Sequence, residues 1–312
     1  MKRSYFTRLF LVTLMFASLC WTGCSTLKSF YGYTSYSAKS ISRKILPGGK
    51  PALGKKVLVA PVINMAAIKN EKAGQITETW LSLLKKDNTL SITPLTGVEI
   101  SKSTVTASEL GIVTDPALVK KAEEMGENVL VTHVLEPFNY TEKKSGIWPF
   151  RKLKGEYDIS MVVTAVDIIN GTIIVSLKES ETIDMGKVSE GQEVSPVLGD
   201  KIRDDALADI QKRLSSELLN ALSAQEWRGK VVRDGEKIKI NGGSDIGITQ
   251  GSIFEVFAKG EAIKSVSGKD YYIAGSKAGE IKVTEVMQDH SMAVPLEGKS
   301  FEDGQIIIFK SK

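Results

Sequence analysis

The stretch YDISMVVTAVDIINGTIIV, residues 157–175, decides the fold of this chain. Apolar side chains alternate with other residues from Tyr157 to Ala165, which is the pattern of a strand with one buried face. Asn170-Gly171 then separates this strand from a second apolar run, Ile173–Val175. Both turn residues tolerate positive φ, so the sequence predicts an antiparallel hairpin closed by a type I′ turn.

The residues around this hairpin alternate between strand and helix patterns. Val57–Ile63 is a continuous apolar run, as expected of a strand covered on both faces. Further strands are predicted at residues 90–92 and 129–134, and helices at residues 70–86 with Asn70 as the cap, 116–125 and 200–222. Met125 and Ile202 belong to the apolar stripes of the last two helices. The pattern predicts an α/β (α+β) layered domain with a mixed sheet over residues 57–224.

Residues 225–312 form a different kind of segment that begins near Trp227. Helical periodicity is lost there, and twelve glycines punctuate the 86 residues from Trp227 onward. Short strands are predicted at residues 230–233, 237–240, 253–257, 280–286, 292–295 and 305–309. Closely spaced strands with Gly turns favour a small all-β domain, which we interpret as an SH3-like barrel.

The N-terminus carries an export signal over residues 1–23. Lys2, Arg3 and Arg8 precede an apolar run, Leu9–Leu19, that is too short for a membrane-spanning helix. The run closes on Thr22-Gly23-Cys24, which resembles a bacterial lipobox despite Trp21 at a position that usually holds an aliphatic residue. The resemblance implies acylation of Cys24, with palmitate among the acyl chains, and transfer to the periplasmic face of the outer membrane. The alternative is ordinary cleavage, which leaves a soluble periplasmic protein.

Residues 24–56 are expected to form a flexible basic tether. From Ser25 to Lys56 there are seven basic residues and no acidic residue, whereas the rest of the chain beyond it carries 31 basic and 37 acidic residues. Ser, Tyr, Gly and Pro are frequent in this segment. The tether could lie on an anionic membrane face, or it could be a solvated spacer.

Two stretches resemble known families. Val57–Leu222 is similar to the curli-secretion (CsgG-type) and TolB N-terminal fold, through its first apolar strand, its Gly126–Pro137 stretch and its Val163–Val175 hairpin. The tail resembles the C-terminal domain of flagellar assembly protein T, through Trp227–Val232, Gly243–Val256 and Gly279–Val286. These resemblances imply an envelope protein that acts with protein partners. Either these partners are other envelope proteins alone, or they include further copies of the chain.

The sequence offers no catalytic, metal or cofactor site. Its two histidines, His133 and His290, lie in different predicted domains, and no H-E-x-x-H, Walker A or G-x-G-x-x-G motif is present. Ser244 lacks the glycine that a nucleophile elbow needs two residues later. Asp204, Asp205 and Asp209 are expected on the solvated face of a helix. Cys20 leaves with the signal and Cys24 carries lipid, so the mature chain has no free thiol.

One loop is the candidate contact site. In the stretch KKSGIWPFRK, residues 143–152, the apolar side chains Ile147, Trp148 and Phe150 stand beside Pro, Gly and basic residues that include Arg151. Trp and Arg are residues that anchor interfaces. Either this loop docks onto a partner or a membrane surface, or Trp148 folds back onto its own domain.

We therefore expect a non-enzymatic, outer-membrane-anchored periplasmic lipoprotein that serves as a scaffold or assembly factor in a flagellar-type envelope machine. Neither nucleic acid nor a small-molecule substrate is expected as a partner. The first alternative is a CsgG-type oligomeric secretion channel, for which residues 139–184 could supply one lipid-crossing hairpin and the polar residues 187–200 a poor second. The second alternative is a lipoprotein activator of cell-wall synthesis.

Overall fold

The computed structural model describes residues 53–97, 116–188, 198–264, 270–297 and 301–310. The predicted signal peptide, Cys24 and the tether up to residue 52 lie outside the described residues. Residues Ala52–Lys312 form one compact unit that contains all the helices and strands named below. The two sheets and the hydrophobic clusters of this unit are built from its own residues, which is what independent folding requires.

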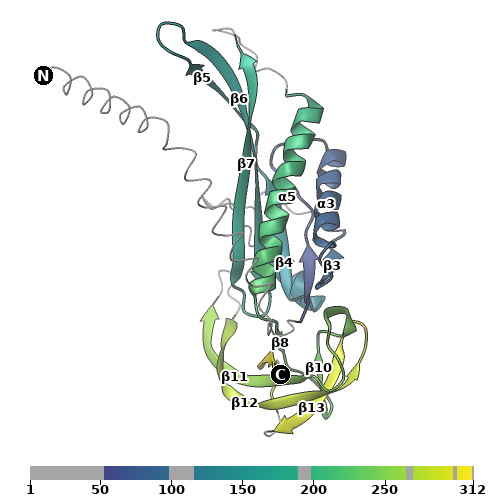
Figure 1. Ribbon diagram of the computed structural model, residues 1–312. Helices are drawn as coiled ribbons and strands as arrows, with labels where there is room; N and C mark the ends of the chain where they lie inside the picture. Colours follow the sequence, from purple (N-terminus) through teal and green to yellow (C-terminus); the bar gives the residue numbers. More distant parts are fainter. Residues whose placement is uncertain (1–52, 98–115, 189–197, 265–269, 298–300, 311–312) are drawn as a thin grey trace, which may run out of the picture. The chain divides into compact units, whose positions relative to one another are not determined.

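The first part of this unit is a mixed seven-stranded sheet, sheet A (Figure 1). Its strands are β1 (Lys55–Val59), β2 (Ile63–Asn64), β3 (Leu90–Pro94), β4 (Val129–Leu135), β5 (Asn139–Ser145), β6 (Lys152–Asp167) and β7 (Ile173–Lys187). Strand β1 pairs in parallel with β3 and β4, whereas β4, β5 and β7 all pair antiparallel with β6. The predicted mixed sheet is therefore confirmed, with β6 as its longest central strand.

The first strand differs from the predicted run in two ways. It begins at Lys55, so Lys55 and Lys56 belong to the sheet and not to the tether. It also ends at Val59, and pairing resumes only in β2 after Pro61. Proline has no N–H to donate to a neighbouring strand, which accounts for the break.

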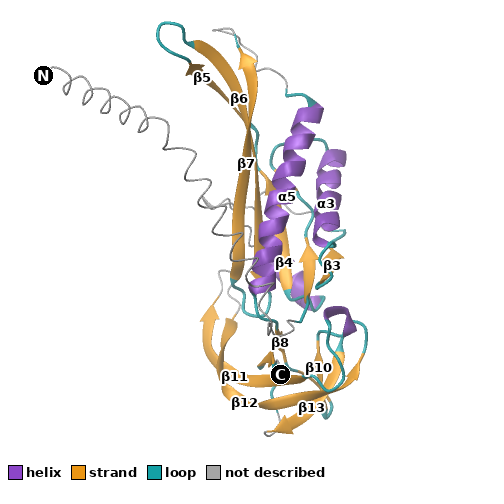
Figure 2. Cartoon of the chain, viewed as in Figure 1, coloured by secondary structure: helices purple, strands orange, loops and turns teal. Residues whose placement is uncertain are grey.

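Three helices cover sheet A on its two faces (Figure 2). They are α3 (Asn70–Leu84), α4 (Pro116–Glu124) and α5 (Asp200–Ala224). Val57 and Val59 of β1 pack with α3 and α5, whereas Leu58 between them packs with Leu118 of α4 on the opposite face. This alternation is what the continuous apolar run of β1 predicts, because neighbouring side chains of a strand point to opposite faces.

Three details of the predicted helices are corrected. The residue that caps α3 is Lys69, and Asn70 is the first helical residue. Met125 is 39 % exposed and Ile202 is 51 % exposed, although both were expected to be buried. Met125 follows the last residue of α4, and Ile202 lies in the first turn of α5, so both positions fall at helix ends. The central residues of the α5 stripe are buried as predicted, from Leu207 through Leu222.

The second part is an antiparallel seven-stranded sheet, sheet B, with a barrel-like, nearly closed path. Its strands are β8 (Arg228–Lys230), β9 (Val232–Asp234), β10 (Lys237–Ile240), β11 (Ile253–Lys264), β12 (Asp270–Val286), β13 (Ser291–Glu297) and β14 (Ile306–Phe309). Strands β8 and β9 end the path at opposite sides, yet only Val231 separates them in the chain. A short all-β module at this place is confirmed, and its SH3-like type stays a prediction.

The hairpin turn between β6 and β7 is longer than predicted. Five residues, 168–172, separate the two strands, and Gly171 has φ +69° while Asn170 does not have positive φ. The type I′ prediction is therefore wrong, because that turn needs positive φ at both residues. The carboxylate of Asp167 accepts the amide of Ile169 at 2.8 Å, which holds the backbone in a wider turn.

Candidate interaction site at the hairpin tip

The hairpin formed by β5 and β6 ends in the candidate contact loop. The pairing runs from Asn139 opposite Asp158 to Ser145 opposite Lys152, which leaves residues 146–151 as the connecting loop. Gly146 opens this loop at φ +113°, a conformation open to glycine because it has no Cβ. The amide of Phe150 donates to the carbonyl of Ile147 at 2.7 Å and closes the turn.

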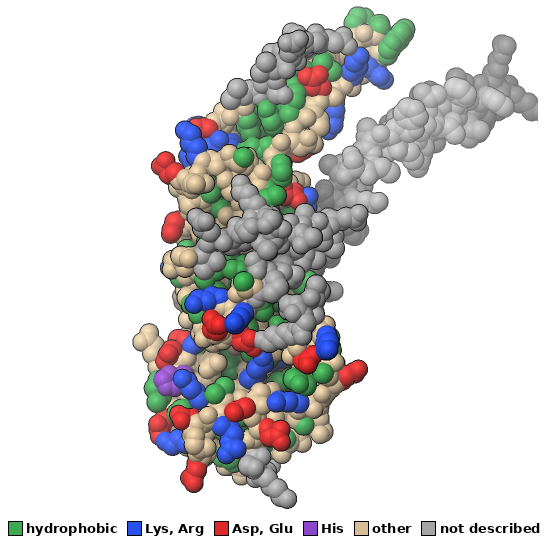
Figure 3. Space-filling view, turned by 180° about the vertical axis from the view of Figure 1, so that it is seen from behind, with side chains coloured by type: hydrophobic (Ala, Val, Ile, Leu, Met, Phe, Trp, Pro, Cys, Tyr) green, Lys and Arg blue, Asp and Glu red, His purple; other side chains and the backbone are tan. Residues whose placement is uncertain are grey.

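Three apolar side chains stand at the end of this loop. Ile147 is 84 % exposed, Trp148 is 77 % exposed and Phe150 is 80 % exposed, and we call these three residues the apolar tip. Figure 3 shows hydrophobic side chains gathered at this end of the hairpin, with Lys and Arg side chains beside them. Trp148 therefore does not fold back onto its own sheet, which was one of the two alternatives. The contact role of the tip stays a prediction.

Basic side chains lie in the loop and on the strands that lead to the apolar tip. They form a set that we call the basic collar: Lys143, Lys144, Arg151, Lys152, Lys154 and Lys187. Over residues 141–156 and 184–187, which strand pairing places side by side, the collar's six positive charges face three carboxylates. Two of them form ion pairs, Glu156 with Lys143 at 2.5 Å and Asp184 with Lys154 at 2.6 Å, and Glu142 accepts a hydrogen bond from the Tyr140 hydroxyl at 3.2 Å. This end of the described structure therefore carries a net positive charge.

Two of the positive charges, on Lys152 and Lys187, are held near each other although they repel. The ammonium of Lys152 lies close enough to Lys187 to lower the pKa of Lys187. Strand pairing keeps them near each other, because Lys154 pairs with Lys187 two residues along β6. Like charges that are held together in this way favour an anionic ligand, which would relieve the repulsion.

The hairpin that presents the tip is braced by its own side chains. The rings of Tyr140 and Tyr157 lie 5.0 Å apart between their centroids, on opposite residues of β5 and β6. Gly155 leaves room for the Tyr140 ring, since a Cβ at this position would lie 2.5 Å from the Tyr140 hydroxyl oxygen. Strand β7 then pairs with β6 as far as Lys154 and adds a third strand. The apolar tip thus stands on a paired base (Figure 1).

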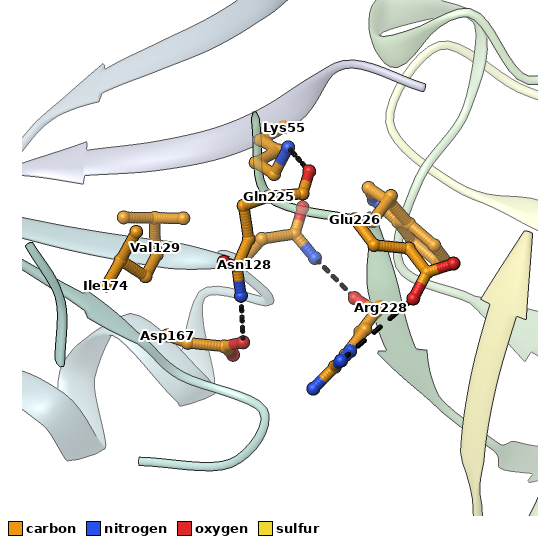
Figure 4. Close-up of a pocket in the computed structure, with 9 residues that line it drawn as sticks. Lys55, Asn128, Val129, Asp167, Ile174, Gln225, Glu226 and Arg228 are labelled. Carbon is orange, nitrogen blue, oxygen red and sulfur yellow. Dashed lines mark hydrogen bonds and ion pairs between the residues drawn. The ribbon is translucent and has the colours of Figure 1, made fainter. Parts of the chain in front are cut away.

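A second polar site joins sheet A to sheet B and was not predicted from the sequence. Figure 4 shows Lys55, Asn128, Asp167, Gln225 and Arg228 around a small cavity of about 10 Å³, about the space of one water molecule. Asn128 Nδ2 donates to the carbonyl of Arg228 at 3.1 Å, and Gln225 Nε2 contacts Asp167 Oδ2 at 3.5 Å.

Burial shifts the pKa values of two groups at this junction. It lowers the pKa of Lys55 to about 8 and raises the pKa of Asp167. Asn128 bonds to the first residue of sheet B, whereas Lys55 and Asp167 contact the end of α5 and Gln225, so we interpret the junction as structural. Sequence patterns carry no signal for it, because its members come from four separate segments.

The other residues singled out from the sequence do not converge on one site. His133 is fully buried in β4 with its ring 5.4 Å from that of Trp80, and burial lowers its pKa to about 3. His290 pairs with Asp289 at 2.7 Å. Asp204 pairs with Lys72 at 2.7 Å and with Arg203.

Neither a metal-ligand cluster nor a membrane-spanning helix is found in residues 53–97, 116–188, 198–264, 270–297 and 301–310. Within these ranges, no group of three or more His, Cys, Asp or Glu side chains is placed to hold a metal ion. In the same part of the chain, no helix is both long enough and apolar enough to pass through a bilayer. Ser244 lies in a short 3₁₀ helix, Ser244–Ile246, and not at a strand-to-helix elbow.

No protein-family model and no curated protein sequence matches this chain. Among solved structures, the chain is similar to the PelC dodecamer from Paraburkholderia phytofirmans, with 16 % identity over 57 % of this chain and 94 % of that one, at a TM-score of 0.30. Lipoprotein GNA1162 from Neisseria meningitidis has 15 % identity over 55 % of this chain and 99 % of its own, at a TM-score of 0.28.

The C-terminal domain of LpoB from Salmonella enterica has 12 % identity over 46 % of this chain and 90 % of its own, at a TM-score of 0.24. The solved structures that resemble this chain thus include bacterial lipoproteins. The likeness is too low to assign their functions to it.

Proposed function

We propose that this chain is a non-enzymatic lipoprotein of the bacterial cell envelope, held on the periplasmic face of the outer membrane by an acylated Cys24. In this proposal it acts by contact, as a scaffold or assembly factor, and the apolar tip is its contact site. The tail's resemblance to flagellar assembly protein T makes a flagellar-type machine the first candidate for its partners.

The exposure of the apolar tip carries this proposal. Leaving one large apolar side chain in water in place of burying it costs about 1.5–3 kcal/mol, so three neighbouring side chains give a strong drive toward a contact. Single exposed apolar residues are common on protein surfaces, but a gathered group marks an interaction site. The tip lies at the end of a paired hairpin and has no packing role for its own sheet, which supports a role in contact.

The channel alternative is less well supported by β5. This strand carries Glu142, Lys143 and Lys144 at consecutive positions, so both of its faces hold a charge. A Lys on a lipid-facing position near the bilayer midplane costs roughly 2–4 kcal/mol. The predicted second hairpin at residues 187–200 lies mostly outside the described residues, and only its ends belong to β7 and α5.

A complementation experiment tests the proposed function. A deletion strain of the source bacterium receives wild type, Trp148→Ala with Phe150→Ala, or the control Ile263→Ala with Ile273→Ala. The control removes two exposed apolar side chains, 50 % and 48 % exposed, from a different hairpin. We expect the tip variant to lose flagellar filaments and the control to keep them, with intact mass spectrometry showing acyl chains on Cys24.

The other outcomes overturn parts of the proposal. If filaments are normal but a secreted fibre is lost, the channel replaces the flagellar proposal. If filaments are normal but cell-wall synthesis is reduced, the activator replaces it. Full activity of the tip variant would remove the tip as the contact site, and an unacylated cytosolic product would overturn the envelope location.

A further inference from the structure

We propose that the apolar tip and the basic collar together bind an anionic phospholipid surface, with the side chains of Ile147, Trp148 and Phe150 entering the headgroup region. This inference rests on the proposed function, since it names the partner of the same site.

The size of the site favours a lipid surface over a protein. A stable protein–protein interface uses about 20–30 residues and buries about 800 Å² on each partner. The loop and its base, residues 143–152, supply ten residues, of which three are exposed and apolar. A bilayer accepts such a narrow apolar tip because lipid rearranges around it and no complementary pocket is needed.

The chemistry of the three side chains fits the same surface. Trp is enriched at the boundary between headgroups and hydrocarbon, where its ring is apolar and its N–H stays hydrated. Ile147 and Phe150 on either side of Trp148 add apolar area without a polar group to desolvate. The tip is too short to cross a bilayer, so it would lie in one leaflet.

The charge of the collar fits an anionic surface. Each Lys or Arg near such a surface contributes about 1 kcal/mol, and long basic side chains can extend toward phosphates while their stems stay in apolar surroundings. Of the three carboxylates at this end, Glu156 and Asp184 are already paired with Lys143 and Lys154, and Glu142 accepts from the Tyr140 hydroxyl. Arg151 and Lys152 adjoin the apolar tip without a carboxylate partner in the described structure, so their charge is available to lipid phosphates.

The support of the tip lowers the cost of binding. The ring contact between Tyr140 and Tyr157 and the pairing of β5, β6 and β7 hold the loop on a formed hairpin before any contact. A preformed site loses less conformational entropy on binding than a flexible segment does.

Vesicle binding by residues 52–312 tests the inference, because this compact unit contains neither the signal peptide nor Cys24. The probes are vesicles of phosphatidylethanolamine with phosphatidylglycerol, and vesicles of phosphatidylcholine alone. We expect wild type to bind the anionic vesicles, and Trp148→Ala with Phe150→Ala to bind them at least about tenfold more weakly. We expect Arg151→Glu with Lys152→Glu to lose the preference for anionic lipid, and added salt to weaken wild-type binding.

The control variant Ile263→Ala with Ile273→Ala is expected to bind as wild type does. Unfolding midpoints equal to that of wild type show that each variant is folded. Equal binding of wild type and the tip variant, or equal binding of wild type to anionic and neutral vesicles, would overturn the lipid inference.

The two proposals fail separately. If the tip variant loses activity in cells while wild type binds none of the vesicles, the tip binds a protein, and only the lipid inference is overturned. If wild type binds anionic vesicles while the tip variant keeps full activity in cells, the lipid inference stands and the tip is not the contact site of the proposed function.

Discussion

Lys55 Nζ donates a 2.8 Å hydrogen bond to the carbonyl oxygen of Leu222, in the last turn of α5. The same ammonium donates to the carbonyl of Gln225 at 2.6 Å. The last carbonyls of a helix have no partner within the helix and carry partial negative charge, so a cation at this place is favourable. The first residue of β1 thereby fixes the end of the helix that leads into sheet B.

Lys55→Met removes this contact and keeps most of the buried stem. We expect a loss of about 1.5–3 kcal/mol in the free energy of unfolding, because two carbonyls lose a charged donor. Urea unfolding of residues 52–312 measures the loss. Lys237→Met is the matched control, since Lys237 pairs with Glu285 at the surface and such pairs contribute about 0–1 kcal/mol. Equal losses in the two variants would show that Lys55 has no special role.

Gly171→Ala tests the contact between the β6–β7 turn and β12. Gly171 has φ +69°, and a Cβ there would lie 2.6 Å from atoms of the buried Tyr271 ring. Gly235→Ala is the control, because Gly235 has φ +63° with open space around it. We expect Gly235→Ala to cost about 1 kcal/mol for its backbone alone, and Gly171→Ala to cost about 1–3 kcal/mol more. Urea unfolding of the two variants measures the difference in unfolding free energy. Equal losses would show that the Tyr271 ring moves aside at no cost.

His133 is expected to make the fold sensitive to acid. Burial lowers its pKa from 6.5 to about 3, so between these values the unfolded chain binds a proton that the folded chain does not. Stability contributed by neutral His133 is therefore full above pH 6.5 and falls as the pH drops toward 3, by about 1.4 kcal/mol per unit.

The variant His133→Leu isolates this effect. Burial raises the pKa of Glu127 and of Asp167, which changes stability in the opposite direction, but these groups are present in both proteins. As the pH falls from 6.5, the unfolding free energy of wild type should therefore decrease relative to that of His133→Leu. A difference that does not change with pH would contradict the burial of a neutral imidazole.

The apolar tip is expected to contribute nothing to stability. Trp148→Ala with Phe150→Ala removes side chains that are 77 % and 80 % exposed, so the free energy of unfolding should change by less than about 0.5 kcal/mol. Thermal unfolding checks this. A larger loss would mean that the tip packs against its own chain in solution, which would remove the physical basis for a contact site.

The sequence predicted most of the elements from local patterns. The alternation from Tyr157 to Ala165 predicted β6, the apolar run at Val57 predicted β1, and Pro116 with Gly126 bounded α4. The polar strand β5 carries no such pattern and was not predicted. Each of these patterns repeats within a few residues, so a single segment carries the whole signal. The type I′ prediction at Asn170-Gly171 is wrong because the Asp167 carboxylate accepts the amides of Ile169 and Asn170, an interaction that the Asn-Gly pattern does not include.

The candidate site divides in the same way. The sequence by itself determined that residues 143–152 combine apolar and basic side chains, because composition is local. It left two alternatives for Trp148, contact with a surface or packing onto its own domain. Only the tertiary structure decided that Trp148 is exposed, that Lys152 and Lys187 lie together, and that Lys55 reaches the end of α5. Those relationships join residues that are far apart in the chain, and their distances are fixed by strand pairing and helix packing, which no local pattern records.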